Sequence, residues 1–343
     1  MRCLRFPALL FALVVLSLLG GLSFGSEDID FAAVVAVLLR RLGGDPAAAV
    51  PDAVDAIVWQ LRLPRVVLAG IVGGGLAIIG VAMQTLVRNP LAEPYILGIS
   101  GGAAAGASLF YLGFLPPLLS RAFSMPLAAF AGGLLSITIV YMVARSGSTL
   151  SVARLLLAGV AMAALMGAIT ALITFASPEP DKLRAILFWL QGSLAGSRWG
   201  SIPLPAITTA FGLALLLALS RPMDAMLLGE EPASSLGVPM ERIKHILIGL
   251  AALVTGTLVA TSGAIGFVGL IVPHIVRFFT GVTHRKLVPA SFFVGAVFLI
   301  WADVAARVLL PSQELPVGAV TAICGVPFFL ALLRRKQYRF QTS

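Results

Sequence analysis

The sequence predicts an all-α, polytopic membrane protein with ten transmembrane helices. Of its 343 residues, 59% are hydrophobic and only 11% are charged. The mean hydropathy is +1.01, and long apolar runs recur from residue 6 to residue 333. Only helices and closed barrels satisfy the backbone hydrogen bonds of such runs in lipid. This composition excludes a soluble globular fold.

The net charge of +9 points to a membrane orientation rather than to nucleic acid. The basic residues stand singly at the ends of apolar runs, which is the pattern of the positive-inside rule. The two cysteines, Cys3 and Cys324, lie far apart and form neither a disulfide framework nor a metal-ligand spacing. We therefore expect no nucleic-acid partner and no metal site.

The N-terminal part predicts one span and one surface segment. Arg2 and Arg5 precede an apolar run at residues 6–24, which suits either a signal peptide or a first span. No small-residue cleavage site closes the run and further spans follow, so we expect an uncleaved helix that begins in the cytoplasm. Residues 27–63 then form an extracytoplasmic segment, with an amphipathic patch at residues 31–42 on its surface.

Spans two to six are predicted within residues 62–219. They are expected at residues 66–86, 96–112, 126–144, 152–175 and 202–219. Two prolines four apart in the break at residues 88–94 stop a continuous helix and predict an ordered cytoplasmic turn.

The stretch at residues 221–245 is the most informative part of the chain. It carries four acids and three Lys or Arg residues between apolar runs, so it must lie in water at one membrane face. Apolar residues threaded through it predict short amphipathic helices. Pro232 suits a first helical turn, and Gly237 suits a left-handed cap at the helix end. The pattern favours a docking surface for a soluble partner, and a surface loop that folds back on its own protein is the alternative.

Spans seven to ten are predicted within residues 246–333. They are expected at residues 246–261, 265–279, 287–305 and 316–333, followed by a basic tail. Ten spans make residues 1–343 a single transmembrane domain with both termini in the cytoplasm. This arrangement places most of the 24 Lys and Arg residues inside.

The sequence carries no energy source of its own. No lysine follows a glycine, so the phosphate-binding loop G-x-x-x-x-G-K-[ST] is missing and no catalytic residue is expected. Asp303 is the one carboxylate within the predicted spans. It stands four residues before Arg307, which predicts an ion pair on one helix face. The three histidines form no recognisable site.

Several motifs together resemble the FecCD family, the membrane permeases of ABC importers for iron–siderophore complexes, haem and cobalamin. The resemblance covers residues 62–333 in order. The motifs are RLPR (62–65), MQTLVRNPLAEPYILGISGG (83–102), RLLLAGV (154–160), WLQGSLAG (189–196), GEEPASSLGV (229–238), GAIGFVGLIVPHIVR (263–277) and ELPVGAVTAICGVPFF (314–329).

The resemblance implies a type II ABC importer permease fold with inverted-repeat character, in the bacterial inner membrane. It implies a homodimer with two ATP-binding cassette subunits, which use ATP and Mg²⁺ and hydrolyse ATP in place of this chain, and a periplasmic binding protein. The chain itself is expected to bind no cofactor. An iron–siderophore is the first choice of substrate, with haem and cobalamin next. The alternative is a secondary, ion-coupled transporter, which would need paired intramembrane carboxylates and would leave residues 221–245 without a role.

The resemblance also implies three sets of site residues. The coupling helices that contact the ATPase match Leu228, Gly229, Glu230, Glu231, Ala233, Ser234, Leu236 and Gly237. The cytoplasmic gate matches Asn89, Leu91, Ser148 and Thr149. The arginines that dock the binding protein match Arg62, Arg65 and Arg307, which we expect to be exposed at the outer surface. The competing interpretation is that these arginines only anchor helix ends at lipid headgroups.

Overall fold

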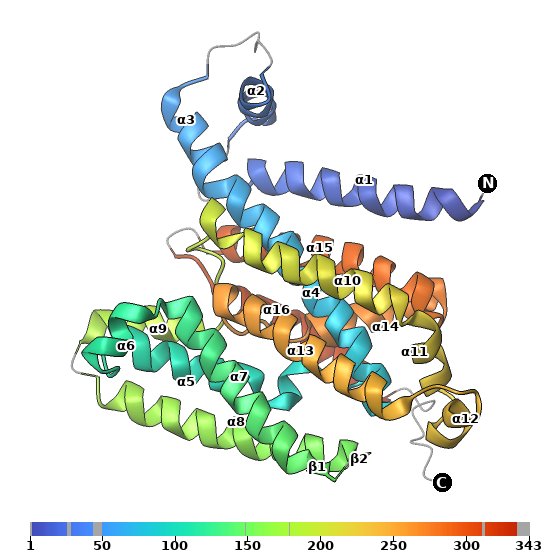
Figure 1. Ribbon diagram of the computed structural model, residues 1–343. Helices are drawn as coiled ribbons and strands as arrows, with labels where there is room; N and C mark the ends of the chain where they lie inside the picture. The colour runs from blue at the N-terminus through green and yellow to red at the C-terminus, as the bar shows by residue number, and fades with distance from the viewer. Residues whose placement is uncertain are drawn as a thin grey trace.

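Long helices that lie alongside one another make up the described part of the chain (Figure 1). The structure is a computed structural model, and it describes residues 2–25, 29–43, 50–147, 149–177, 179–310 and 313–334. Its strands within these residues are one short antiparallel pair, β1 (Arg145–Ser146) and β2 (Thr149–Leu150). The predicted all-α class is confirmed, while Ser148 and the basic tail from residue 335 onward lie outside the described residues.

The helices follow one another with short connections. In the first half they are α1 (Arg2–Ser23), α2 (Phe31–Arg41), α3 (Asp52–Ala56), the π-helix η1 (Ile57–Arg62), α4 (Leu63–Val87), the 3₁₀-helix η2 (Pro94–Leu97), α5 (Ile99–Tyr111), α6 (Pro117–Ala122), α7 (Met125–Ala144) and α8 (Val152–Phe175). In the second half they are α9 (Pro180–Leu190), the 3₁₀-helix η3 (Trp199–Ser201), α10 (Pro203–Ala218), α11 (Ser220–Met226), α12 (Glu230–Ser235), α13 (Met240–Ser262), α14 (Val268–Thr280), α15 (His284–Val308) and α16 (Val317–Arg334).

Six helical segments among the described residues are long and apolar enough to cross a membrane. They are Asp52–Val87, Met125–Ala144, Val152–Phe175, Trp199–Ala218, Met240–Ser262 and His284–Val308. The other four predicted spans fall on shorter helices, namely the apolar parts of α1, α14 and α16, and α5 with its 13 residues. The multi-pass character is confirmed, and the count of ten stays a prediction.

Helix α4 forms the centre of the bundle, because its apolar window is 89% buried. Glycines let its backbone touch those of its neighbours. A Cβ on Gly73 would lie 2.2 Å from the carbonyl oxygen of Gly295 in α15, and one on Gly80 would lie 2.0 Å from that of Gly269 in α14. Small residues at these crossings therefore set the helix separation.

The second span begins earlier than predicted, and the surface segment at residues 27–63 is correspondingly shorter. Helix runs without interruption from Asp52 to Val87. Pro64 has no N–H to donate, but a π-turn precedes it, in which the Leu63 N–H bonds to the carbonyl of Val58 five residues back. Such a turn absorbs a proline within a helix. Arg62 and Arg65 consequently lie inside a continuous helix rather than at its mouth.

The predicted water-exposed stretch at residues 221–245 also ends earlier, because α13 begins at Met240. Lys244 is only 3% exposed. Its ammonium group lies 3.0 Å from the carboxylate of Glu241 on the same helix, so the two charges compensate each other within the first turns. The polar part outside the long helices is therefore α11, α12 and their connections.

The two ends of the bundle carry different elements (Figure 1). The start of α1, the helices α11 and α12, and the β1–β2 pair lie at one end, which we call the inner end. The helices α2, α3, α6 and α9 lie at the other, which we call the outer end. The turn after α4 joins the inner end through Arg88, whose guanidinium lies 3.7 Å from the Glu230 carboxylate of α12. This agrees with the predicted sharing of one face by residues 88–94 and 221–245.

Candidate functional sites at the two ends of the bundle

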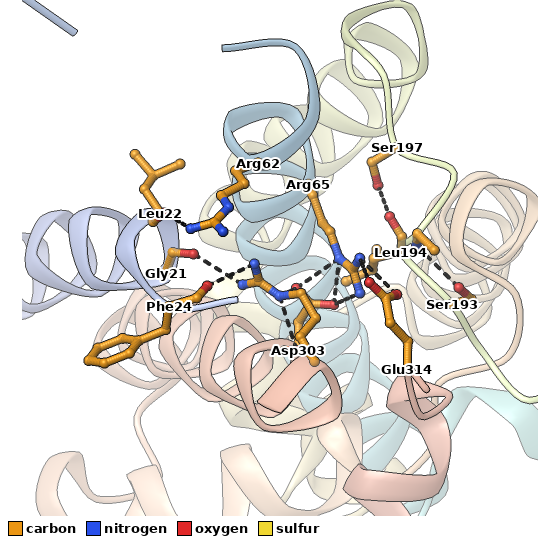
Figure 2. A network of polar contacts seen from close by, with 12 residues as sticks. Gly21, Leu22, Phe24, Arg62, Arg65, Ser193, Leu194, Ser197, Asp303 and Glu314 are labelled. Carbon is orange, nitrogen blue, oxygen red and sulfur yellow. Dashed lines mark hydrogen bonds and ion pairs between the residues drawn. The ribbon is translucent and has the colours of Figure 1, made fainter. Parts of the chain in front are cut away.

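Arg65 is the centre of a buried ion cluster at the outer end (Figure 2). Its Nε donates to both carboxylate oxygens of Asp303, at 3.0 and 3.1 Å. Its Nη1 donates to both oxygens of Glu314, at 3.0 Å each. Helix α4 thereby bonds to α15 and to the segment that leads into α16. Charge-assisted bonds of this kind are the strong ones.

The other two arginines of the cluster cap the end of α1. Arg62 Nη1 donates to the carbonyls of Leu22 and Ser23, at 2.8 and 2.9 Å. Arg307 donates to the carbonyls of Phe24 and Gly21, each at 3.1 Å. The last carbonyls of a helix lack partners within it and form the negative end of its dipole, so cations are stabilised there.

The predicted ion pair between Asp303 and Arg307 is confirmed, because Arg307 Nε lies 3.2 Å from the Asp303 carboxylate. The expected exposure of the arginines is wrong, since Arg62, Arg65 and Arg307 are 7%, 9% and 6% exposed. The physical reason is that each one is used to hold helices together. Sequence reasoning missed Glu314, and the ELPVGAV motif that contains it was the available signal.

The three arginines nevertheless border open space. Together with Glu314, Ser197 and Leu61 they line a cavity of about 480 Å³ at the outer end. The lining residues of this cavity include three arginines and one carboxylate, Glu314, so positive charge predominates in the lining. Such a cavity suits the entry of an acidic group more than that of a basic one.

Helix α12 at the inner end has the first-turn proline and the C-terminal glycine cap that the sequence predicts. Pro232 lies in its first turn, and Gly237 follows its end with φ +79°. The Val238 N–H bonds to the Ala233 carbonyl, and the Gly237 N–H to the Ser234 carbonyl, at 3.1 and 2.9 Å. These two bonds define a Schellman motif.

Apolar side chains cover the outside of this element. Leu227, Leu228 and Leu236 are 43%, 65% and 67% exposed, while Ala233 between them is fully buried. Leu227 and Leu228 precede α12 and Leu236 follows its last residue. Exposed large apolar side chains on a segment outside the long helices indicate an interaction surface. We call these three residues the leucine patch.

Ion pairs fix the leucine patch to the bundle. The Lys244 ammonium lies 3.0 Å from the Glu230 carboxylate, which joins α12 to α13. Asp224 of α11 accepts from the backbone N–H and the Nδ1 of His284, at 2.9 and 2.6 Å, which joins α11 to α15. Thr85 of α4 completes this chain with a 2.7 Å contact to His284 Nε2. Sequence reasoning missed the partners of His284 because they lie 60 and 199 residues away along the chain.

The described gate residues lie in two separate connections. Asn89 accepts from the Leu91 N–H at 2.9 Å, in the turn that follows the left-handed Arg88. Thr149 is exposed in β2, beside Leu150, whose N–H donates to Glu241 at 2.9 Å. The structure thus attaches both connections to the α12–α13 region, and the gating role stays a prediction.

Glu93 is a further buried group that sequence reasoning missed. It follows the gate turn and accepts from the backbone N–H of Phe267, a residue with φ +69°. Nearby, the Tyr95 hydroxyl donates to the Ile265 carbonyl at 2.8 Å and accepts from its N–H at 3.0 Å. Burial raises the pKa of Glu93 to about 7, because the one backbone hydrogen bond compensates only part of the lost hydration. The connection after α4 is thereby held against the loop that precedes α14.

Comparison with known proteins places the whole bundle among transporters. A model of the FecCD transport family matches residues 9–335. The cobalamin import system permease protein BtuC of Halobacterium salinarum is 43% identical over 84% of this chain and 76% of its own length. The hemin transport system permease protein HmuU of Yersinia pestis is 41% identical over 83% of this chain and 85% of its own.

Two further matches agree. The Fe(3+) dicitrate transport system permease protein FecD of Escherichia coli is 39% identical over 81% of this chain and 85% of its own length. A solved structure of a metal-chelate type ABC transporter, in an inward-facing conformation, has a TM-score of 0.82 at 30% identity. It covers 96% of this chain and 98% of its own.

Proposed function

The chain belongs to the FecCD transport family, and from this premise we propose that it is the membrane-spanning permease of an ATP-driven importer for a metal chelate. One observation carries the proposal. One charged site and one apolar site lie at opposite ends of the helical bundle, namely the arginine-lined cavity at the outer end and the leucine patch at the inner end. A permease that takes its substrate from one soluble protein and is driven by a soluble ATPase needs one contact surface at each end.

The leucine patch supports contact with an ATPase. Leu228 and Leu236 are exposed on either side of the short helix α12, whose C-terminal end is capped by a Schellman motif and whose first residue is held by an ion pair. Helices α11 and α12 are bonded to α4, α13 and α15. A movement of the partner would therefore displace these long helices as well. We propose two ATP-binding cassette subunits beneath a permease homodimer, so that ATP and Mg²⁺ are bound by the partners.

The arginine-lined cavity supports contact with a binding protein. Arg62, Arg65 and Arg307 present positive charge to the cavity although their side chains are mostly buried. An acidic side chain of the partner would enter the cavity rather than meet the arginines on a flat surface. Ion pairs enclosed in an interface couple more strongly than exposed ones.

The substrate class follows from the relatives rather than from the cavity. The matched permeases are named for cobalamin, hemin and Fe(3+) dicitrate. We propose an iron–siderophore first, with haem and cobalamin next. A secondary carrier is less well supported, because the intramembrane carboxylate Asp303 is held by Arg65 and Arg307 and is not available to an ion.

The proposal is tested by reconstitution. Tagged permease, co-expressed with an ATP-binding cassette subunit and a binding protein from an importer of the same family, is expected to bring down the ATPase. Vesicles with the complex should then take up one of the three chelates only when ATP is supplied. Uptake that needs an ion gradient and no ATPase would instead establish a secondary transporter.

We expect Glu314→Gln to strengthen docking of the binding protein by about 2- to 5-fold, since a half-exposed ion pair contributes about 0 to 1 kcal/mol. Glu314 holds Arg65 and is 38% exposed, so it competes with an incoming carboxylate. Surface plasmon resonance with the complex in nanodiscs measures the affinity. The matched control is Glu179→Gln, which removes an exposed carboxylate that pairs with Lys182 near the start of α9 at the same end. Weaker docking in Glu314→Gln would show that Glu314 faces the partner itself.

A further inference from the structure

A groove of about 260 Å³ lies between α7 and α13. Its walls are mainly apolar and come from both helices. The lining residues that matter here are Leu134, Ile137 and Tyr141 of α7, and His245, Gly249 and Ala252 of α13. None of the residues that the structure describes fills it. A slender apolar chain fits it.

The groove changes character along its length. Leu134 and Ala252 line its apolar part, whereas Tyr141 and His245 stand together toward the inner end, with ring centroids 5.6 Å apart in an edge contact. Tyrosine and histidine in this position suit the boundary between hydrocarbon and headgroups. The groove therefore runs from the hydrocarbon to the headgroup level.

Positive charge lies at the polar end. Arg145 directly follows α7, four residues after Tyr141, and Arg242 precedes His245 by three residues on α13. Both arginines are exposed. Glu241, the acid next to Arg242, is already held by Lys244 at 3.0 Å and by the Leu150 N–H at 2.9 Å. An anion at this end would meet two cations and an acid whose charge is compensated.

From this geometry we propose that the groove binds one anionic phospholipid, with an acyl chain along α7 and α13 and the phosphate group at Arg145 and Arg242. The chemistry that recognises it is a phosphate diester joined to a long apolar chain. The inference is independent of which chelate the permease carries.

Gly249 makes the groove testable, because a Cβ built on it meets no atom within 4 Å. A side chain at this position therefore points into the groove without displacing its neighbours. Gly249→Leu fills the groove, and Gly249→Ala is the matched control that adds one carbon and leaves most of the space open. Arg145→Gln with Arg242→Gln removes the charges and leaves the apolar walls intact.

The experiment is native mass spectrometry of the purified permease complex with added lipid. Phosphatidylglycerol and phosphatidylcholine with identical chains are compared, together with glycerol phosphate as the headgroup alone. We expect wild type and Gly249→Ala to retain phosphatidylglycerol in preference to phosphatidylcholine, and glycerol phosphate not to bind. Gly249→Leu should lose the bound lipid, and the double arginine variant should lose the preference, by roughly fivefold per arginine.

Three outcomes would overturn the proposal. The first is equal retention of both lipids by wild type, which shows general lipid coating. The second is unchanged lipid binding in Gly249→Leu with a normal thermal unfolding midpoint. The third is dissociation of permease copies by Gly249→Leu without loss of lipid, which assigns the groove to a protein contact. If Gly249→Leu does not fold, the double arginine variant, whose changes are exposed, decides the matter through the lipid preference alone.

Discussion

Replacing Leu236 by aspartate is expected to weaken binding of the ATPase by about 30-fold or more, while the helical bundle stays folded. Leu236 is 67% exposed, so the chain itself gains little from its side chain. In the proposed complex it would be buried in the partner, and truncation of such an anchor typically costs about 2 kcal/mol or more. A carboxylate in its place would also be desolvated, which adds to the loss.

A second change tests the shape of the same element without altering its chemistry. Gly237 has φ +79°, and a Cβ on it would meet nothing within 4 Å. Gly237→Val is therefore disfavoured by backbone conformation alone, because β-branched residues avoid positive φ. Gly237→Asn is the matched control, since asparagine tolerates the left-handed region. We expect valine to weaken ATPase binding and asparagine to preserve most of it.

Co-purification and ATP-dependent uptake in vesicles measure both effects. Leu118→Asp serves as a control, because Leu118 is 81% exposed in α6 at the opposite end of the bundle. This variant makes the same leucine-to-aspartate substitution at a position where no contact with the ATPase is proposed. Full recovery of the ATPase with Leu236→Asp would remove α12 from the coupling surface.

The local features of α12 could be predicted because they depend on neighbouring residues. A proline in the first turn and a glycine after the last turn define the ends of a short helix wherever it lies. The continuous apolar runs of α7 and α8 are local in the same way, and their predicted bounds agree with the structure to within one residue. A helix and its ends can be predicted from the sequence when the residues that determine them all lie within one segment.

The long-range features could not be predicted in this way. Arg65 bonds to Asp303 and Glu314, which lie 238 and 249 residues further along the chain. Nothing in the spacing of RLPR indicates those partners, so an arginine near a predicted helix end was expected to be exposed. The predicted seventh span was too short for a local reason. Lys244 is charged, but Glu241 and Glu230, which lie nearby in the sequence, compensate its charge and allow it to be buried. Charge alone does not decide burial when a partner compensates it.

The buried position of the outer arginines changes how their role must be tested. Reversal of Arg65 to glutamate would place a third carboxylate against Asp303 and Glu314. Like charges in a buried site destabilise the fold itself. Loss of docking in that variant would then report damage to the bundle and say nothing of the binding protein. The docking hypothesis is better tested at Glu314, and the structural role at Asp303.

Asp303→Asn is expected to destabilise the permease by about 3 to 5 kcal/mol, the usual effect of removing one partner from a buried ion pair. Asp303 is fully buried, and it compensates Arg65 at 3.0 Å and Arg307 at 3.2 Å. Asparagine has nearly the same shape, so the change removes charge and leaves the packing intact. Two guanidinium groups would then lie close together, and among the described ion pairs the half-exposed Glu314 would be the carboxylate left to compensate them.

The matched comparison is Glu314→Gln, which removes the other carboxylate from the same arginine. Its side chain is 38% exposed, against 1% for Asp303, so water replaces the lost partner and we expect a loss of about 0 to 1 kcal/mol. Thermal unfolding of the detergent-solubilised permease, followed by circular dichroism, ranks the two variants. Adding Arg307→Gln to Asp303→Asn should recover part of the stability, because it removes a buried charge that has lost its counter-ion. Equal midpoints for Asp303→Asn and Glu314→Gln would show that the cluster does not hold α4 and α15 together through Asp303.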